Sequence, residues 1–221
     1  MAIAATLVGS IEQTTNTATA TVTATTTNGS TWVVWAATNA AAWMVPAITD
    51  NKGNTYTKIG ADVTAFTVTG TLWYTQNGTG GASHTFTATP LVAGLNTLIV
   101  VEVTGGALTG ILDQSAGGTD DVATPFTSAV TGTTTQANEV ALAFEFDNRA
   151  SGSAITWGGG YTSLVDLTNT AGVTAAAAKL ILSATGTQQS TFTNANTTEA
   201  VSWVATFKEA AADTLMGQAC L

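Results

Sequence analysis

Asp50-Asn51-Lys52-Gly53-Asn54-Thr55-Tyr56 is a polar turn with a glycine at its apex and a β-branched, aromatic exit. The segment Thr31–Trp35 lies upstream of it and Leu72–Tyr74 lies downstream, and both are rich in the residue types of strands. The pattern therefore predicts that this turn joins strands rather than helices. The rest of the chain repeats the same alternation of apolar runs and Gly, Asn or Asp turns.

Strand-like segments recur at short, regular intervals, and helical periodicity is almost absent. We expect about ten to twelve strands in an antiparallel all-β sandwich of jelly-roll type. The predicted strands lie within residues 19–25, 31–37, 55–59, 65–69, 71–75, 84–88, 95–103, 126–130, 139–146, 161–167, 174–183 and 201–207. Apolar side chains on both faces place residues 31–37 at the centre of a sheet, whereas the alternation in 139–146 predicts a half-buried strand.

The sequence also predicts the form of two connections between strands. The glycine-rich turn at residues 77–81 predicts a hairpin with the strand that follows it. Residues 107–124 are rich in glycine and aspartate, which predicts a long loop with Asp113, Asp120 and Asp121 exposed.

A chain of 221 residues is long enough for one large β domain, and all-β sandwiches of this length are commonly single domains. We expect an N-terminal arm at residues 1–18, a sandwich domain at 19–208 and a C-terminal tail at 209–221, with no exact internal repeat. Cys220 is the only cysteine, so the fold is expected to be stable without an internal disulfide bond. This thiol is either unpaired in the tail or forms an intermolecular disulfide between subunits.

Charged residues make up only 9% of the chain, and the net charge is −9 at pH 7. The five Lys and Arg residues are scattered, which argues against nucleic-acid binding because phosphate neutralisation needs clustered cations. No run reaches the roughly 18 apolar residues of a membrane span, and residues 1–10 lack the positive region of a secretory signal, so we expect synthesis in a cytoplasm and no membrane partner. Hydroxyl and amide groups cover the remaining surface, which suits packing against neighbouring molecules.

Several motifs together resemble a known class of module. They are Trp32–Ala36, the 50–56 turn, Leu72–Tyr74, Gly81–Thr87, Leu98–Gly105, Leu112-Asp113, Ala137–Ala143 and Trp203–Lys208. Over about residues 19–208 their order is similar to that in the jelly-roll β-sandwich modules of phage virion proteins and bacterial surface proteins. None of the motifs is catalytic.

The resemblance implies a non-enzymatic structural component of a virion, such as a capsid decoration (cement) protein or a fibre module. It further implies a homo-oligomer that binds the major capsid protein or another virion protein after assembly in the host cytoplasm.

One segment also resembles an enzyme motif. Glu145-Phe146-Asp147 is similar to the start of the Glu-x-Asp-x-x-Glu strand of laminarinase-like glucanases, but Arg149-Ala150 stand where the third acid should be. Retaining hydrolysis needs two carboxyl groups about 5 Å apart. We therefore expect no enzymatic activity, and a glucanase relic is the minor alternative.

We expect no cofactor. His84 is the only histidine, so a multi-histidine metal site is excluded, and the residue is predicted to belong to a hairpin. Asp50, Asn51 and Asn54 predict an Asx-turn rather than a calcium loop, because the closing acid is missing. The three aspartates of the 107–124 segment either bind calcium or are solvated.

The aromatic residues divide into two groups. Trp32, Trp35 and Trp203 lie inside apolar strands, which predicts core packing. Exposed aromatic rings on a β-sandwich can stack on sugars, so the alternative function is a carbohydrate-binding, lectin-like module of a tail or surface fibre. The candidate residues for this platform are Trp43, Trp73, Tyr74, Trp157 and Tyr161.

Overall fold

Sixteen β-strands make up the part of the chain that the computed structural model describes, which is residues 2–40, 47–89, 93–120, 125–148, 154–168, 172–193 and 199–211. All strand pairings are antiparallel, which confirms the predicted all-β sandwich. These ranges contain no helix that could cross a membrane.

The strands fall into two halves of the chain. The first half contains β1 (Ala4–Glu12), β2 (Ala20–Thr26), β3 (Thr31–Thr38), β4 (Ile48–Asp50), β5 (Thr57–Ala65), β6 (Val68–Thr75), β7 (Gly81–Ala88) and β8 (Asn96–Thr104). The second half contains β9 (Leu112–Asp120), β10 (Phe126–Thr127), β11 (Asn138–Asn148), β12 (Thr156–Trp157), β13 (Thr162–Thr168), β14 (Val173–Ser183), β15 (Thr191–Thr193) and β16 (Ala200–Lys208).

The two halves have the same strand order. The first half forms a five-stranded sheet, β1-β8-β3-β6-β5, and a three-stranded sheet, β2-β7-β4. The second half forms β9-β16-β11-β14-β13 and β10-β15-β12, so each of its strands takes the place of the strand eight numbers earlier. The fold is therefore a tandem pair of one eight-stranded arrangement.

A few residues are identical at equivalent positions of the two halves. Phe86 and Phe192 stand in the middle of Thr-Phe-Thr motifs on the equivalent strands β7 and β15. Tyr56 and Tyr161 directly precede the equivalent strands β5 and β13. The duplication therefore lies in the topology, with few identical residues to mark it.

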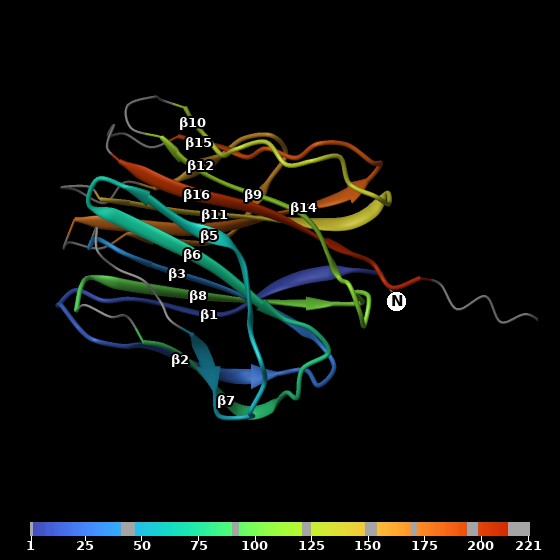
Figure 1. Ribbon diagram of the computed structural model, residues 1–221, viewed down its shortest axis with the longest axis horizontal. Helices are drawn as coiled ribbons and strands as arrows, with labels where there is room; N and C mark the ends of the chain where they lie inside the picture. Colours follow the sequence, from blue (N-terminus) through green and yellow to red (C-terminus); the bar gives the residue numbers. More distant parts are fainter. Residues whose placement is uncertain are drawn as a thin grey trace, which may run out of the picture.

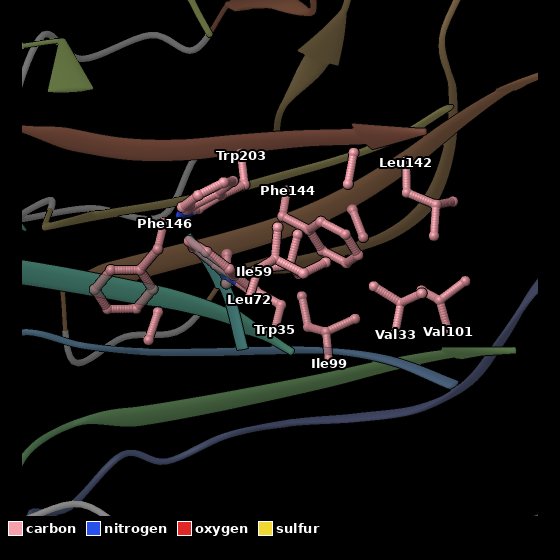
Figure 2. Close-up of a cluster of buried hydrophobic side chains, with 14 of the residues drawn as sticks. Val33, Trp35, Ile59, Leu72, Ile99, Val101, Leu142, Phe144, Phe146 and Trp203 are labelled. Carbon is pink, nitrogen blue, oxygen red and sulfur yellow. The ribbon is translucent and has the colours of Figure 1, made fainter. Parts of the chain in front are cut away.

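Figure 1 shows the sheets stacked in four layers, with the two five-stranded sheets in the middle and a three-stranded sheet on each outer side. The main hydrophobic core lies between the five-stranded sheets and takes residues from both halves (Figure 2). Trp35 of β3 stacks on Phe144 of β11 with ring centroids 5.9 Å apart. The two halves therefore share one core, and burial of apolar surface between them is the main source of stability.

Smaller clusters fill the spaces under the outer sheets. Trp32, Val34 and Phe86 belong to the cluster between β3 and the β2-β7-β4 sheet. In the second half, Phe126 and Phe192 stack at 5.2 Å beneath the β10-β15-β12 sheet. Each five-stranded sheet is consequently covered on both faces.

Burial on both faces was predicted for β3 but not for β11. All eight residues of β3 are buried, and the strand lies in the middle of its sheet. On β11, Glu139 and Glu145 are fully buried beside Ala141 and Ala143, so the prediction of a half-buried strand is wrong. The outer sheet and its connections cover the face that the alternation assigned to solvent.

Two segments that were expected to lie outside regular structure form strands. Residues 4–12, within the expected N-terminal arm, are β1 and pair along β8. Residues 112–120, within the expected long loop, are β9 and pair with β16. The glycines that suggested a loop are needed there, because a Cβ at Gly117 would lie 2.5 Å from the indole of Trp203.

Other connections differ from the expected hairpins. Residues 76–80 lead from β6 in the five-stranded sheet to β7 in the three-stranded sheet, so these strands do not pair. The expected short strands at 55–59 and 65–69 are replaced by β5, which runs to Ala65 with an irregularity between Ile59 and Val63, and by β6, which begins at Val68. The strands expected near residues 19–25, 95–103, 161–167, 174–183 and 201–207 are confirmed within two residues at each end.

Replacement of Phe144 by alanine should lower the free energy of unfolding by about 3–5 kcal/mol, because it removes a fully buried ring from the shared core. The matched control is Phe66→Ala, which alters a ring that is 67% exposed and should change stability by less than about 0.5 kcal/mol. Denaturant unfolding measures both variants. Equal losses would contradict the shared core.

Candidate functional site

The carboxylate of Asp50 is the centre of a polar network that holds the 50–56 turn. Its Oδ1 accepts hydrogen bonds from the backbone N–H groups of Lys52 (2.9 Å) and Asn54 (3.1 Å), which confirms the predicted Asx-turn. Its Oδ2 accepts from Asn54 Nδ2 (2.7 Å), Tyr56 Oη (2.7 Å) and His84 Nε2 (2.9 Å). The side chain is fully buried, so both oxygens are committed to the protein itself.

His84 connects this network to the outer sheet. Its Nδ1 lies 2.8 Å from the hydroxyl of Thr26, which itself accepts a hydrogen bond from the backbone N–H of Gly81. The imidazole stacks on Phe86 at 4.1 Å and meets Trp32 edge-on at 4.7 Å. The residue is fully buried on β7, so the expectation that it belongs to a β6–β7 hairpin is wrong.

The hydrogen bonds keep Asp50 ionised. Burial alone would raise its pKa, but the hydrogen bonds from Asn54, His84 and Tyr56 outweigh burial and lower the pKa to about 2. In turn, burial and the neighbouring carboxylate raise the pKa of Tyr56 well above its ordinary value. The phenol of Tyr56 therefore remains protonated and donates its hydrogen bond to Asp50 at neutral pH.

The histidine–aspartate pair joins the turn to the outer sheet. Both imidazole nitrogens of His84 are engaged, and neither His84 nor Asp50 lines a described cavity. A general base must reach the proton that it abstracts. The pair therefore positions the turn, and the surface that the turn presents is the candidate site.

A groove of about 370 Å³ lies beside the turn. Residues 53–55 and Thr57 form one side, and residues 74–78, at the end of β6 and just beyond it, form the other. Asn54 connects the two sides, since its Oδ1 accepts from Thr79 N–H (2.8 Å) and its Nδ2 donates to Thr79 O (3.0 Å). The lining consists of amides, hydroxyls, backbone and one phenol, with no charged side chain.

The predicted aromatic platform is not one surface. Trp73 is only 8% exposed and Tyr161 only 6%, so the expectation that their rings are exposed is wrong. Trp157 is half-buried against Phe192, in the second half of the chain. Trp43 lies outside the described residues. Of the predicted members, Tyr74 alone lines the groove.

The structure describes two of the three aspartates of residues 107–124, and it does not bring these two together. Asp113 and Asp120 are seven positions apart on β9, which separates them by roughly 23 Å in an extended strand. Asp113 accepts hydrogen bonds from the N–H (2.5 Å) and hydroxyl (2.7 Å) of Thr135, and its side chain is only 3% exposed. Asp121 lies outside the described residues, as does Cys220. Within the described ranges, no group of three or more His, Cys, Asp or Glu side chains could hold a metal ion.

The glucanase-like motif is buried. Glu145 and Asp147 are both fully buried on the face of β11 that lies beneath the outer sheet, and Arg149-Ala150 lie outside the described residues. A glycosidic bond could not reach carboxyl groups in that position. This counts against the glucanase alternative.

A pair of carboxyl groups that the sequence did not predict lies on the second five-stranded sheet, with Glu139 at the start of its central strand β11 and Asp113 on its edge strand β9. Burial raises the pKa of Glu139 to about 7, and the neighbouring carboxyl of Asp113 adds to the rise. Burial works against Asp113 as well, but the hydrogen bonds from Thr135 and the ammonium group of Lys208, 3.7 Å away, lower its pKa. Glu139 opens an alternating strand, so its sequence context predicted an exposed outer face.

The groove residues were also missed as a set. No sequence motif indicates a binding role for Thr57, Gln76 or Asn77. The pattern at residues 77–81 predicted only a hairpin turn. Comparisons with protein-family models, with curated proteins and with solved structures found no significant match to the chain.

Asp50→Asn should lower the free energy of unfolding by about 2–4 kcal/mol, because an amide cannot replace the charge that Tyr56 and His84 face. The matched control is Asp62→Asn, whose side chain is 15% exposed and pairs with Lys58, and this change should cost less than about 1 kcal/mol because the amide oxygen can still accept a hydrogen bond from Lys58. Denaturant unfolding at pH 7 compares them. A loss at Asp50 no larger than that at Asp62 would disprove the role of the network.

Glu139→Gln should flatten the pH profile of stability between about pH 4.5 and pH 7. The raised pKa means that the folded state binds more protons than the unfolded chain in this window, so the free energy of unfolding of the unmodified protein falls as the pH rises through it, by up to about 3 kcal/mol. Ser163→Ala, at an exposed position of β13 that carries no titratable group, is the control and should leave the slope unchanged. An unchanged slope in Glu139→Gln would contradict the assignment.

Proposed function

We propose that the protein is a non-enzymatic structural component of a virion, of the capsid decoration (cement) kind, and that each half is a jelly roll. The orders β1-β8-β3-β6-β5 and β2-β7-β4 place the first strand beside the last in one sheet and the second beside the seventh in the other, as two interleaved Greek keys require, although β5 lies beside β6 and not beside β4. The resemblance of the 50–56 turn and of the strand motifs to virion modules supports the same conclusion.

The observation that carries the proposal is the chemistry of the two outer sheets. Both present threonines in register across neighbouring strands: Thr21 and Thr87, Thr23 and Thr85, and Thr49 and Thr87 in the first half, and Thr127 and Thr191, and Thr156 and Thr193 in the second. The hydroxyls of Thr23 and Thr85 lie 2.9 Å apart. The duplication thus places similar uncharged faces on opposite outer sides of the molecule (Figure 1).

Two such faces suit a protein that connects neighbours. The desolvation free energy of an uncharged face is small when it meets another neutral surface, because no charge must be removed from water. One chain can then contact two subunits at once, and the second contact gains from the first through effective concentration. The partners that we propose are the major capsid protein or another virion protein, and further copies of this chain.

Mass spectrometry of gradient-purified virus particles from a lysate of the source organism tests the proposal. The chain should be present in a fixed ratio to the major shell protein, and mass photometry of the purified chain should show an oligomer or, after addition of these particles, particle-bound material. A strictly monomeric protein that is absent from the particles would overturn the proposal.

Thr23→Glu and Thr127→Glu should each weaken binding to the particles by about tenfold or more, and the double variant should weaken it further, because a carboxylate would be desolvated in the contact. Thr109→Glu, in the exposed connection after β8, is the matched control and should bind normally. Sedimentation with the particles measures all four variants, and circular dichroism confirms folding. Normal binding of the double variant would exclude the outer sheets as contact faces.

A further inference from the structure

We propose that the groove beside the 50–56 turn binds an uncharged sugar residue, as a site separate from the outer threonine faces. The inference does not depend on the proposed virion function, since it is carried by the groove alone. Its volume of about 370 Å³ falls at the lower end of the range for small-molecule sites. This size suits one or two sugar rings at the end of an oligosaccharide.

The groove offers hydrogen-bonding groups that the protein does not use itself. The side chains of Thr55, Thr57, Tyr74 and Asn77 line it, and none of them hydrogen-bonds another described residue. Hydroxyls and amides are both donors and acceptors, as sugar hydroxyls are, so each can pair with either role of the ligand. A neutral polyhydroxyl ligand is the chemical class that satisfies this lining.

The ring of Tyr74 supplies the apolar part of the site. It is half-buried, packs edge-on against Phe207 at 6.2 Å, and lies opposite Thr57 on the paired strand β5. A fixed aromatic ring with free polar neighbours can contact the C–H face of a sugar while its hydroxyls bond to the side chains around it. Anionic sugars find no cationic partner in the lining, and the net charge of −9 opposes them.

Both sides of the groove are fixed before any ligand binds. On one side, the buried Asp50 carboxylate holds Asn54 through its side chain and its backbone. On the other, Gly78 is tied to Ser30 and Gly29 by backbone hydrogen bonds, and a Cβ at Gly78 would lie 2.1 Å from the Trp32 ring. Preorganisation of this kind reduces the entropy lost on binding.

The second half of the chain shows that the fold does not need this turn. The equivalent connection is the shorter segment 158–161, which consists of three glycines and Tyr161. Trp157 stands where Asp50 stands in the first half, since Trp157 pairs with Phe192 as Asp50 pairs with Phe86. The stack of sheets forms there without an Asp–His network. The longer, polar 51–56 segment is therefore specific to the first half, and it forms one side of the groove.

Site-resolved NMR titration of the full chain tests the inference. The probes are the methyl glycosides of glucose, galactose, mannose and N-acetylglucosamine, with sialic acid as the anionic comparison, each up to tens of millimolar. At least one neutral glycoside should shift the amide signals of residues 53–57 and 74–78, and sialic acid should not. Shifts elsewhere only, a preference for sialic acid, or no shift with any neutral probe would overturn the proposal.

The duplication provides matched variants. Thr57→Ala and Asn77→Gly should each weaken binding of the responding glycoside by about threefold or more, glycine being chosen because Asn77 has a positive φ of 49°, whereas Thr162→Ala, at the equivalent start of β13, should leave it unchanged. All three changes are at exposed positions, so folding is expected to survive, and the amide spectrum confirms it. Equal affinity in all three variants would exclude the groove. Presence in particles is measured separately, so failure here leaves the virion proposal unaffected.

Discussion

The structure around the candidate site depends on one buried carboxylate. Asp50 ends β4 in an outer sheet, and the segment after it crosses to β5 in a central sheet. By accepting hydrogen bonds from Lys52, Asn54, Tyr56 and His84, Asp50 fixes both the crossing and the side of the groove. A buried charge is tolerated only when it is this fully satisfied, so the network either forms as a whole or destabilises the turn.

The tandem arrangement explains why such a network could be added to one copy. The shared core between the five-stranded sheets stabilises both halves at once, so a connection at the rim can differ between the halves while the strand order stays the same. The second half fills the equivalent space with Trp157, Tyr161 and Phe192, which is an apolar solution to the same packing problem. The first half therefore has a polar connection and the second half an apolar one, although both halves have the same strand order.

The sequence predicted those features that depend on local pattern. The strands β3, β8 and β16 follow from their apolar, β-branched runs, and the Asx-turn follows from Asp50 and its neighbours. Features that depend on pairing between distant strands were missed. Gly117 suggests a loop until Trp203 is known to lie against it, and the approach of His84 to Asp50 requires β4 and β7 to be neighbours. The duplication could not be predicted from the sequence, because the two halves share their strand order and few identical residues.

The central claim is that an ionised, fully hydrogen-bonded Asp50 organises the turn and the groove. Its most direct test is carbon-detected NMR titration of the Asp50 carboxyl between pH 1.5 and pH 7 in the folded protein. We expect a pKa of about 2, with the amide signals of the turn changing at the same pH. Titration near the ordinary value of 3.8, with no coupled change in the turn, would contradict it.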